Sequence, residues 1–343
     1  MDKKVIFAVA GSGKTTLIIN ELTLHNRSLI VTYTNNNTEN LRQSIIAKFG
    51  YFPSNITLLP YFTFLYSFCY KPFLSYKHKT KGITYERNPN KFANSKDRQY
   101  FFDKLDKIYS NRIAKFLEAQ SVLDEINYRL SKYFDNLFID EIQDLAGHDF
   151  NLLTSLSKAP LKITLVGDFY QHTFDTSRDG TVNKNLHEDY AGYKKLFTKM
   201  GMADDTKTLS KSYRCSPITC DFITKYIGIS IQSHNKNETK VHLVDTEDFA
   251  DEIFKSNEVI KLFLQEHYRY GCYSRNWGEC KGEDKYDDIC VVLNKTTLSN
   301  YNKGTLKTLV PQTKNKLYVA CSRAKKDMYL VSDELYKKYK IPR

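Results

Sequence analysis

The stretch AVAGSGKTT, residues 8–16, decides the fold class of this chain. It follows a short apolar run, Val5–Val9, that is typical of a buried parallel strand, and it leads into Thr16–Leu24, which has the pattern of a helix. Strand, glycine-rich loop and helix in this order form a phosphate-binding loop. Glycine lets backbone N–H groups approach phosphate oxygens, and a helix N-terminus favours negative charge. The stretch therefore predicts ATP or GTP as a ligand.

Two side chains of the loop have defined roles in this chemistry. Lys14 can reach the β- and γ-phosphates, and the Thr15 hydroxyl can bind Mg²⁺. The usual pattern has glycine at the first of eight positions, where this chain has Ala8. The predicted nucleotide-contacting residues of the loop are Ala10, Gly11, Ser12, Gly13, Lys14, Thr15 and Thr16.

Composition and charge narrow the class of partner. The 343 residues suffice for two ordinary domains, and 51 Lys and Arg against 39 Asp and Glu give a net charge of +12. The 25 Tyr and 21 Phe are spread among these charges. A basic, aromatic-rich surface suits a polyanion with stackable bases, although a generically basic protein has the same composition. Charge alone leaves both interpretations open.

The cysteines and the hydropathy favour a reducing, aqueous compartment. None of the seven cysteines forms a C-x-x-C pair, so the sequence indicates neither a zinc site nor a disulfide framework. No run of about 18 apolar residues is present, which argues against a membrane partner. We expect a cytoplasmic location.

Strand and helix patterns alternate along the chain and predict an α/β fold with parallel sheets covered by helices. Leu29–Tyr33 and Ile56–Leu59 are expected strands on either side of a helix at Thr38–Phe49. Later strands are expected at Leu137–Ile139, Ile163–Val166, Lys240–Val244, Ile289–Leu293 and Met328–Val331. The alternation stops at residues 71–132, where 14 basic residues face 7 acidic ones, so we expect a mainly helical insertion there. Its interleaved basic and aromatic residues suit a nucleic-acid backbone or a solvated helical face. The segment GMADDTKT at residues 201–208 is the expected joint between the two halves.

A second nucleotide element is LFIDEIQD, residues 137–144. Its apolar strand ends at Asp140 and Glu141, so that one carboxylate can hold the water shell of Mg²⁺ and the next can polarise an attacking water. An acidic strand end alone is a weak signal. Together with Lys14 it predicts nucleotide hydrolysis.

The chain resembles the UvrD/Rep-like superfamily 1 helicases, whose motifs it carries in order. Motif I, in which alanine at the first position is common, is similar to residues 8–16, and motif II is similar to residues 137–144. The other resemblances are IVTYTNNNTENLRQSI (30–45, motif Ia), TFLYSF (63–68, motif Ib, with Leu65 in place of histidine), VGDFYQHTF (166–174, motif III), SYRCSP (212–217, motif IV) and LYVACSRAKKDMYLV (317–331, motif VI).

Motif V is placed in WGECKGEDKYDDICVVL, residues 277–293, where Lys281 and Gly282 precede an acidic stretch and a strand. The family's ribose-contacting glutamate corresponds to Asp284, so Gly282 and Asp284 are candidate nucleotide contacts. A second placement, at Asn302–Gly304, ranks below because no apolar strand follows it closely.

The resemblance implies roles for further residues. Gln171 would sense the γ-phosphate, Arg214 and Arg323 would stabilise its charge, and Tyr213 would stack near the adenine. The implied nucleic-acid contacts are Tyr33, Thr63, Phe64 and Phe174. The implied architecture is two RecA-like P-loop NTPase domains, at residues 1–205 with the insertion at about 71–132, and at residues 206–343.

The resemblance implies an ATP-dependent DNA helicase or single-stranded DNA translocase that uses ATP and Mg²⁺ and moves 3′ to 5′. Only Cys215–Glu279 separates motifs IV and V, which leaves no room for the large second insertion of full-length relatives. Two alternatives therefore stay open. One is a motor or ATP-gated switch subunit that works with a protein partner such as a nuclease in DNA repair or phage defence. The other is a nucleotide-binding fold without turnover. RNA in place of DNA also stays open.

Overall fold

The computed structural model describes residues 2–177 and 181–342, which form two compact units. The first unit comprises Met1–Ile6, Thr15–Gly167 and Phe174–Asp205. The second comprises Phe7–Lys14, Asp168–Thr173 and Thr206–Arg343. The phosphate-binding loop up to Lys14 thus belongs to the second unit, while the helix that continues it belongs to the first.

The first unit is built on a six-stranded sheet in the order β3-β2-β6-β7-β1-β8. Its strands are β1 (Lys3–Phe7), β2 (Ser28–Thr32), β3 (Ile56–Pro60), β6 (Asn136–Ile139), β7 (Lys162–Gly167) and β8 (Ala203–Asp205). The pairs β2·β3, β2·β6, β6·β7 and β1·β8 are all parallel. Parallel strands need crossover helices on the faces of the sheet, and the central strands are accordingly apolar and buried.

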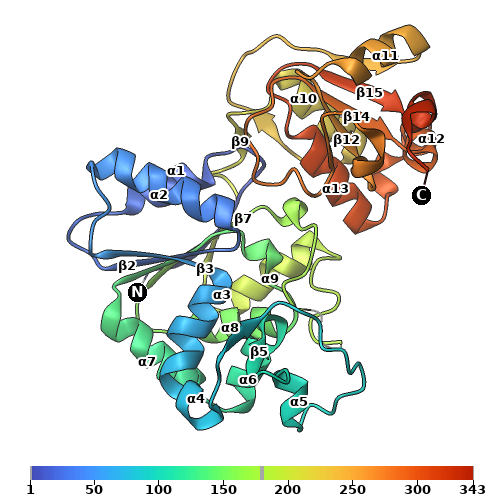
Figure 1. Ribbon diagram of the computed structural model, residues 1–343. Coiled ribbons are helices and arrows are strands. Elements are labelled where there is room, and N and C mark those ends of the chain that lie inside the picture. Colours follow the sequence, from blue (N-terminus) through green and yellow to red (C-terminus); the bar gives the residue numbers. More distant parts are fainter. Residues whose placement is uncertain (1, 178–180, 343) are drawn as a thin grey trace. The chain divides into compact units, whose positions relative to one another are not determined.

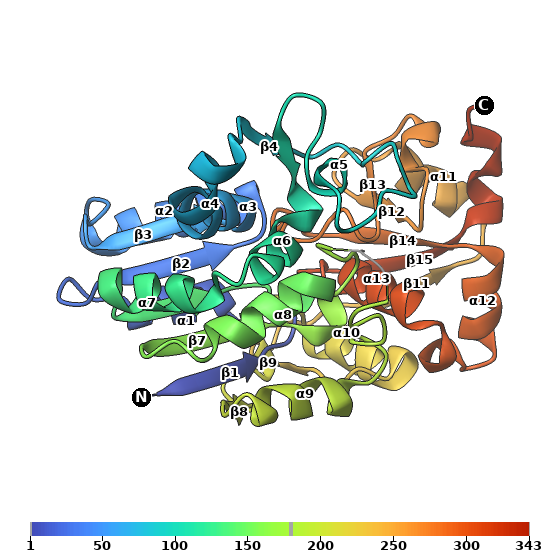
Figure 2. The ribbon, with the colours of Figure 1, turned by 90° about the horizontal axis from the view of Figure 1, so that it is seen from below.

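Helices cover both faces of this sheet, as Figures 1 and 2 show. Helices α1 (Lys14–Glu21) and α2 (Asn35–Phe49) lie on one face, while α3 (Tyr61–Thr63), α7 (Leu123–Tyr133) and α8 (Gly147–Leu156) lie on the other. Helix α9 (Tyr190–Lys199) leads to β8. Right-handed crossovers explain the division, since the chain moves across the sheet in one direction from β1 to β3 and in the other after β3.

The insertion after β3 is helical, with one small sheet added. A buried π-helical segment, Phe64–Tyr70, runs into α4 (Lys71–His78). The strands β4 (Gly82–Thr84) and β5 (Lys107–Tyr109) then pair in parallel. Helices α5 (Arg98–Phe101) and α6 (Ile113–Ala119) complete the insertion. Its core is a cluster of rings around Phe116, whose centroid lies 4.7 to 6.0 Å from those of His78, Phe101, Phe102 and Tyr70.

The second unit has a five-stranded parallel sheet in the order β11-β15-β14-β12-β13. Its strands are β11 (Val241–Val244), β12 (Ile260–Phe263), β13 (Ser274–Asn276), β14 (Ile289–Leu293) and β15 (Met328–Ser332), and a separate pair joins β9 (Lys211–Ser212) to β10 (Gln232–Ser233). Its helices are α10 (Pro217–Phe222), α11 (Glu247–Lys255), α12 (Lys295–Asn302) and α13 (Pro311–Cys321). The core of this unit gathers around the fully buried Trp277 and Tyr318.

The predicted α/β class with parallel sheets is confirmed, but some strands of the structure were not predicted from the sequence. The apolar pattern of β12 is interrupted by Lys261, which is fully buried. Its ammonium donates to the carbonyls of Ser256 (2.5 Å) and Val259 (2.9 Å). These bonds satisfy its charge inside the sheet. The expected joint at residues 201–208 contains β8, a polar edge strand whose only pairing in the described sheet is with β1. Among the described residues, no helix is long and apolar enough to cross a membrane.

We predict that Asp149 of α8 makes stability pH-dependent. Burial raises the pKa of its carboxyl to about 7, although Thr176 and Tyr61 oppose the shift. Because this pKa is higher in the folded state than in the unfolded chain, the contribution of Asp149 to the free energy of unfolding is fully present below about pH 4. It is lost as the pH rises through about 7. Asp149→Asn should therefore raise the thermal unfolding midpoint, by an amount that grows from about pH 4 to pH 7 and then levels off.

Circular dichroism melts across this pH range measure the effect. Asp245→Asn, at an exposed aspartate, is the matched control and should show no such growth. A gain from Asp149→Asn that is equal at every pH would contradict the prediction.

Candidate functional site

The two predicted catalytic carboxylates lie side by side where β6 ends. Asp140 and Glu141 are both buried, and an Asp140 carboxylate oxygen accepts the Glu141 backbone N–H at 2.9 Å. The side-chain amide of Gln143 donates to the Glu141 carboxylate. Glu141 has a left-handed backbone, with φ of +58°, which is an uncommon conformation for a side-chain-bearing residue. The strand end thus holds both carboxylates in fixed orientations.

The other first-unit part of the predicted site is the start of α1. Thr15 is partly buried in its first turn, and Thr16 next to it is exposed. A hydroxyl in the first turn of a helix lies among N–H groups that have no partner within the helix, as a magnesium-bound phosphate requires.

The loop backbone in the second unit has the shape of an anion cradle. Gly11 and Gly13 have φ of +68° and +88°, which turns the backbone in a way that side-chain-bearing residues rarely adopt. The hydroxyl of Ser12 between them is buried and has no hydrogen-bond partner among the described residues. A buried hydroxyl without a partner costs free energy unless a ligand satisfies it. These residues therefore fit a bound phosphate.

Arg214 lies against this loop within the second unit. The Tyr213 backbone N–H donates to the Gly11 carbonyl at 2.8 Å. A Cβ at Gly11 would lie 2.7 Å from the Arg214 Cβ and 2.9 Å from the Ser212 hydroxyl. Glycine is thus required here by close approach as well as by its φ angle. The structure brings together the predicted phosphate loop and one predicted arginine.

Arg214 also pairs with Asp284, in the segment predicted as motif V. The Arg214 Nε donates to Asp284 at 2.6 Å, and its Nη1 donates to the Ser322 carbonyl at 3.2 Å. The Asp284 carboxylate, expected to contact a ribose, is thus engaged by Arg214 in this structure, although 63% of its side chain stays exposed. Gly282, at φ of +81°, lies two residues before it. The lower-ranked segment Asn302–Gly304 closes helix α12 instead.

Arg323 is buried without a carboxylate. Its Nε donates to the Val319 carbonyl at 3.2 Å and its Nη1 to the Glu283 carbonyl at 2.9 Å. It is 3% exposed, and within the described part of the chain it forms no ion pair with an acidic side chain. Burial and the nearby positive charge of Arg214 lower its pKa to about 10, so it stays charged at neutral pH. A buried guanidinium of this kind is poised to accept an anion.

Tyr318 of α13 joins the loop to motif III and was not singled out from the sequence. Its hydroxyl accepts the Ala10 backbone N–H at 2.8 Å and donates to Asp168 at 2.9 Å. Asp168 also accepts the Tyr170 backbone N–H at 3.1 Å, in the short helical turn that carries Gln171. Gln171 is 3% exposed. The sequence could place Tyr318 within motif VI but could not predict its hydrogen bonds, because both partners are remote in sequence.

Tyr213 is suited to stack on a flat ligand. Its side chain is 61% exposed, and its ring stacks on His234 with centroids 4.2 Å apart and planes 24° apart. The other face of the tyrosine is therefore the one that a base could cover.

The predicted nucleic-acid residues separate into surface and core. Tyr33 and Phe174 are partly exposed and their ring centroids lie 5.1 Å apart, while Thr63 is exposed. Phe64 is fully buried and stacks on Phe68 at 5.7 Å. Phe64 was expected to contact nucleic acid, and its buried ring leaves no face on which a base could stack. The π-helical turn that follows Thr63 directs this ring into the core.

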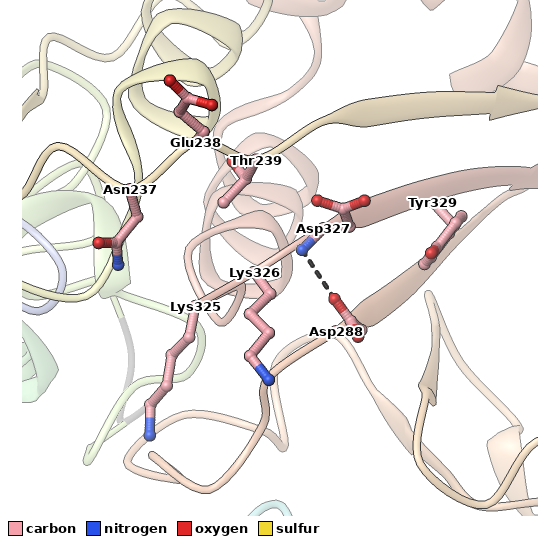
Figure 3. A pocket seen from close by; sticks show the side chains of 8 residues that line it. All are labelled: Asn237, Glu238, Thr239, Asp288, Lys325, Lys326, Asp327 and Tyr329. Atoms are coloured by element: carbon pink, nitrogen blue, oxygen red, sulfur yellow. Dashed lines mark hydrogen bonds between the residues drawn. The ribbon is translucent and has the colours of Figure 1, made fainter.

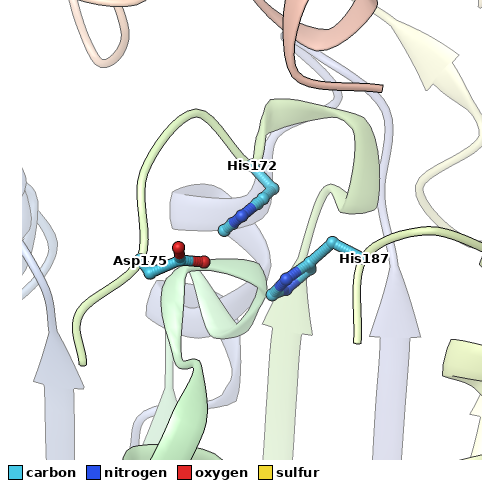
Figure 4. A group of neighbouring side chains, drawn as sticks. All are labelled: His172, Asp175 and His187. Atoms are coloured by element: carbon cyan, nitrogen blue, oxygen red, sulfur yellow. The ribbon is translucent and has the colours of Figure 1, made fainter. Parts of the chain in front are cut away.

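Two further groups receive no role. A pocket of about 480 Å³ in the second unit is lined by both charges, among them Asp288, Lys325 and Lys326 (Figure 3). Figure 4 draws the side chains of His172, Asp175 and His187, and no site is assigned to them because His172 belongs to the second unit and the other two belong to the first.

Comparison with protein families identifies a helicase core in this chain. The family described as viral superfamily 1 RNA helicase core domain matches residues 108–332. No curated protein matches the sequence. An arterivirus nonstructural protein 10 helicase, solved with DNA, has 13% identity and a TM-score of 0.50 over 97% of this chain and 62% of its own. The PRRSV helicase has 13% identity and a TM-score of 0.48 over 99% of this chain and 54% of its own. The chain thus spans less than two thirds of either helicase.

We predict that Tyr318→Phe destabilises the fold, because it leaves the Ala10 N–H and the Asp168 carboxylate without this buried partner. The unfolding free energy should fall by about 1–3 kcal/mol, measured by denaturant titration. Tyr301→Phe is the matched control, since that hydroxyl has no hydrogen bond among the described residues and should cost far less. Equal losses from both variants would contradict the role of Tyr318.

Proposed function

Because the chain belongs to the viral superfamily 1 RNA helicase core domain family, we propose that it is an ATP-driven motor on single-stranded nucleic acid. The observation that carries the proposal is the buried Arg323, which lacks a carboxylate partner among the described residues and lies within electrostatic reach of Arg214 at the phosphate loop. Two guanidinium groups repel each other at close range. Arg214 already pairs with Asp284, so a triphosphate would offset this repulsion and give Arg323 the anionic partner that it lacks among the described residues.

The proposed roles follow from the chemistry of each side chain. Lys14 holds the β- and γ-phosphates, Thr15 and Asp140 hold Mg²⁺, and Glu141 orients and polarises the attacking water. Bound Mg²⁺ supplies positive charge that offsets the charge of the phosphates. Gln171 is proposed to report the γ-phosphate, and Arg214 and Arg323 to stabilise the charge that develops on it. Tyr213 stacks on the base, and Gly282 and Asp284 lie at the sugar side.

Two RecA-like domains, residues 1–205 with the insertion at 71–132 and residues 206–343, are proposed as the moving parts. In this proposal, phosphate release removes the negative charge that the arginines of the second domain bind, so each cycle of hydrolysis changes how firmly the two domains are held to each other. A strand bound to both domains would then be moved. The resemblance to UvrD/Rep-like helicases supports DNA as substrate and 3′ to 5′ as direction, while the family's description supports testing RNA beside it.

The central test is ATP hydrolysis with and without oligo(dT) and oligo(rU). We expect stimulation by a single strand that weakens as salt rises, because phosphate contacts release counterions, and no hydrolysis by Lys14→Ala. Displacement of strands from 3′-tailed and 5′-tailed duplexes then gives the direction. Basal hydrolysis without stimulation would contradict a stand-alone motor and favour the alternative of a subunit that works with a protein partner.

We also predict that Arg323→Ala lowers kcat for ATP by about 10³-fold or more while the protein still binds ATP, as expected for an arginine that stabilises transferring phosphate. Steady-state kinetics and fluorescent-nucleotide binding separate the two effects. Arg27→Ala removes an exposed arginine paired with Asp135 and is the matched control. Hydrolysis that is unchanged in Arg323→Ala would overturn this assignment.

A further inference from the structure

A row of aromatic rings lies at the carboxyl end of the first unit's sheet. Tyr33 follows β2 directly, and its ring centroid lies 5.8 Å from that of Phe62, which comes just after β3. Phe174, which follows β7 in the chain, lies 5.1 Å from Tyr33. Tyr85, which follows β4 of the insertion, lies 5.6 Å from Phe62 in an edge-to-face arrangement. We name Tyr33, Phe62, Tyr85 and Phe174 the aromatic row.

The aromatic row faces outward. Tyr33, Phe62 and Phe174 are partly exposed, and the Tyr85 side chain is 68% exposed. Tyr61 beside them is 3% exposed and serves as their support, with its centroid 5.6 Å from that of Phe62. A contiguous group of rings that are at least partly exposed is a common mark of a binding site, because leaving apolar area in water costs free energy. Carboxyl strand ends are also where ligands of parallel sheets bind.

The charge around Tyr85 selects a polyanion. The insertion that carries it has 14 basic residues against 7 acidic ones at residues 71–132. Lys81, four residues before Tyr85, has a 70% exposed side chain whose ammonium lies 3.4 Å from the Asp106 carboxylate. Burial raises the pKa of the Tyr33 hydroxyl above its ordinary value, so this ring stays neutral and does not repel phosphates. Rings for bases and lysines for phosphates are the two elements of a single-strand site.

We propose that Tyr85 extends a base-stacking track out of the helicase core and onto the insertion, so that a base of a bound single strand stacks on its exposed ring. The inference rests on the proposed function and adds a contact that no motif contains. Because every base has a π-face, the contact has no sequence preference and accepts DNA or RNA. The bound nucleic acid would then contact the insertion as well as the helicase core.

The test compares strands that differ only in their bases. Fluorescence anisotropy measures binding of labelled oligo(dT), oligo(rU) and an abasic oligomer of equal length to the full chain without nucleotide. Tyr85→Ala should weaken binding of both base-bearing strands by about 5-fold to 100-fold and leave the abasic strand unchanged. Tyr85→Phe, which keeps the ring, should bind as the unaltered protein does.

Tyr51→Ala is the matched control. Tyr51 is 56% exposed and precedes β3, so it lies at the amino end of the same sheet, away from the aromatic row. Binding by Tyr85→Ala that equals binding by Tyr51→Ala overturns the inference, as does an equal loss on the abasic strand, which would indicate a phosphate contact. If the unaltered protein binds none of the strands, the proposed function fails first and the inference fails with it.

Discussion

The C-terminal turn of α13 is the constraint on which the second unit depends. A helix C-terminus presents carbonyl oxygens with partial negative charge, and here they bind cations: the carbonyl of Val319 accepts from Arg323 and that of Ser322 accepts from Arg214. These contacts allow a buried guanidinium to stay charged without a carboxylate of its own. Had an acidic side chain neutralised Arg323, little attraction for a phosphate would remain.

The same helix also organises the phosphate loop. Tyr318, which directly precedes Val319, accepts the Ala10 N–H and donates to Asp168, and Asn315 donates to the His172 carbonyl at 3.1 Å. Three motifs that lie far apart in the chain therefore share one rigid element. Helix α13 and its C-terminal cap therefore connect the two arginines with the loop and with motif III through hydrogen bonds within the second unit.

The sheet of the first unit positions carboxylates and aromatic rings, whereas the second unit positions two arginines. The buried strand β6 fixes Asp140 and Glu141 at its end, and the left-handed Glu141 redirects the chain so that Gln143 can reach back to it. At the same edge, Tyr33 and Phe62 follow neighbouring strands. Because these strands are parallel, the two carboxylates and the aromatic rings lie along the same edge of the sheet.

Local sequence patterns are enough to predict several features of this protein. Glycine spacing before Lys14 specifies a phosphate loop, the apolar run before Asp140 specifies a strand ending in carboxylates, and the alternation of strands and helices specifies parallel sheets. Other features depend on long-range packing: Asp284 binds Arg214, Tyr318 binds Ala10, Phe64 faces the core and Tyr85 joins the aromatic row. The reason is physical: Ala10 and Tyr318 are 308 residues apart and Arg214 and Asp284 are 70 apart, and no local periodicity records which distant side chains packing will bring together.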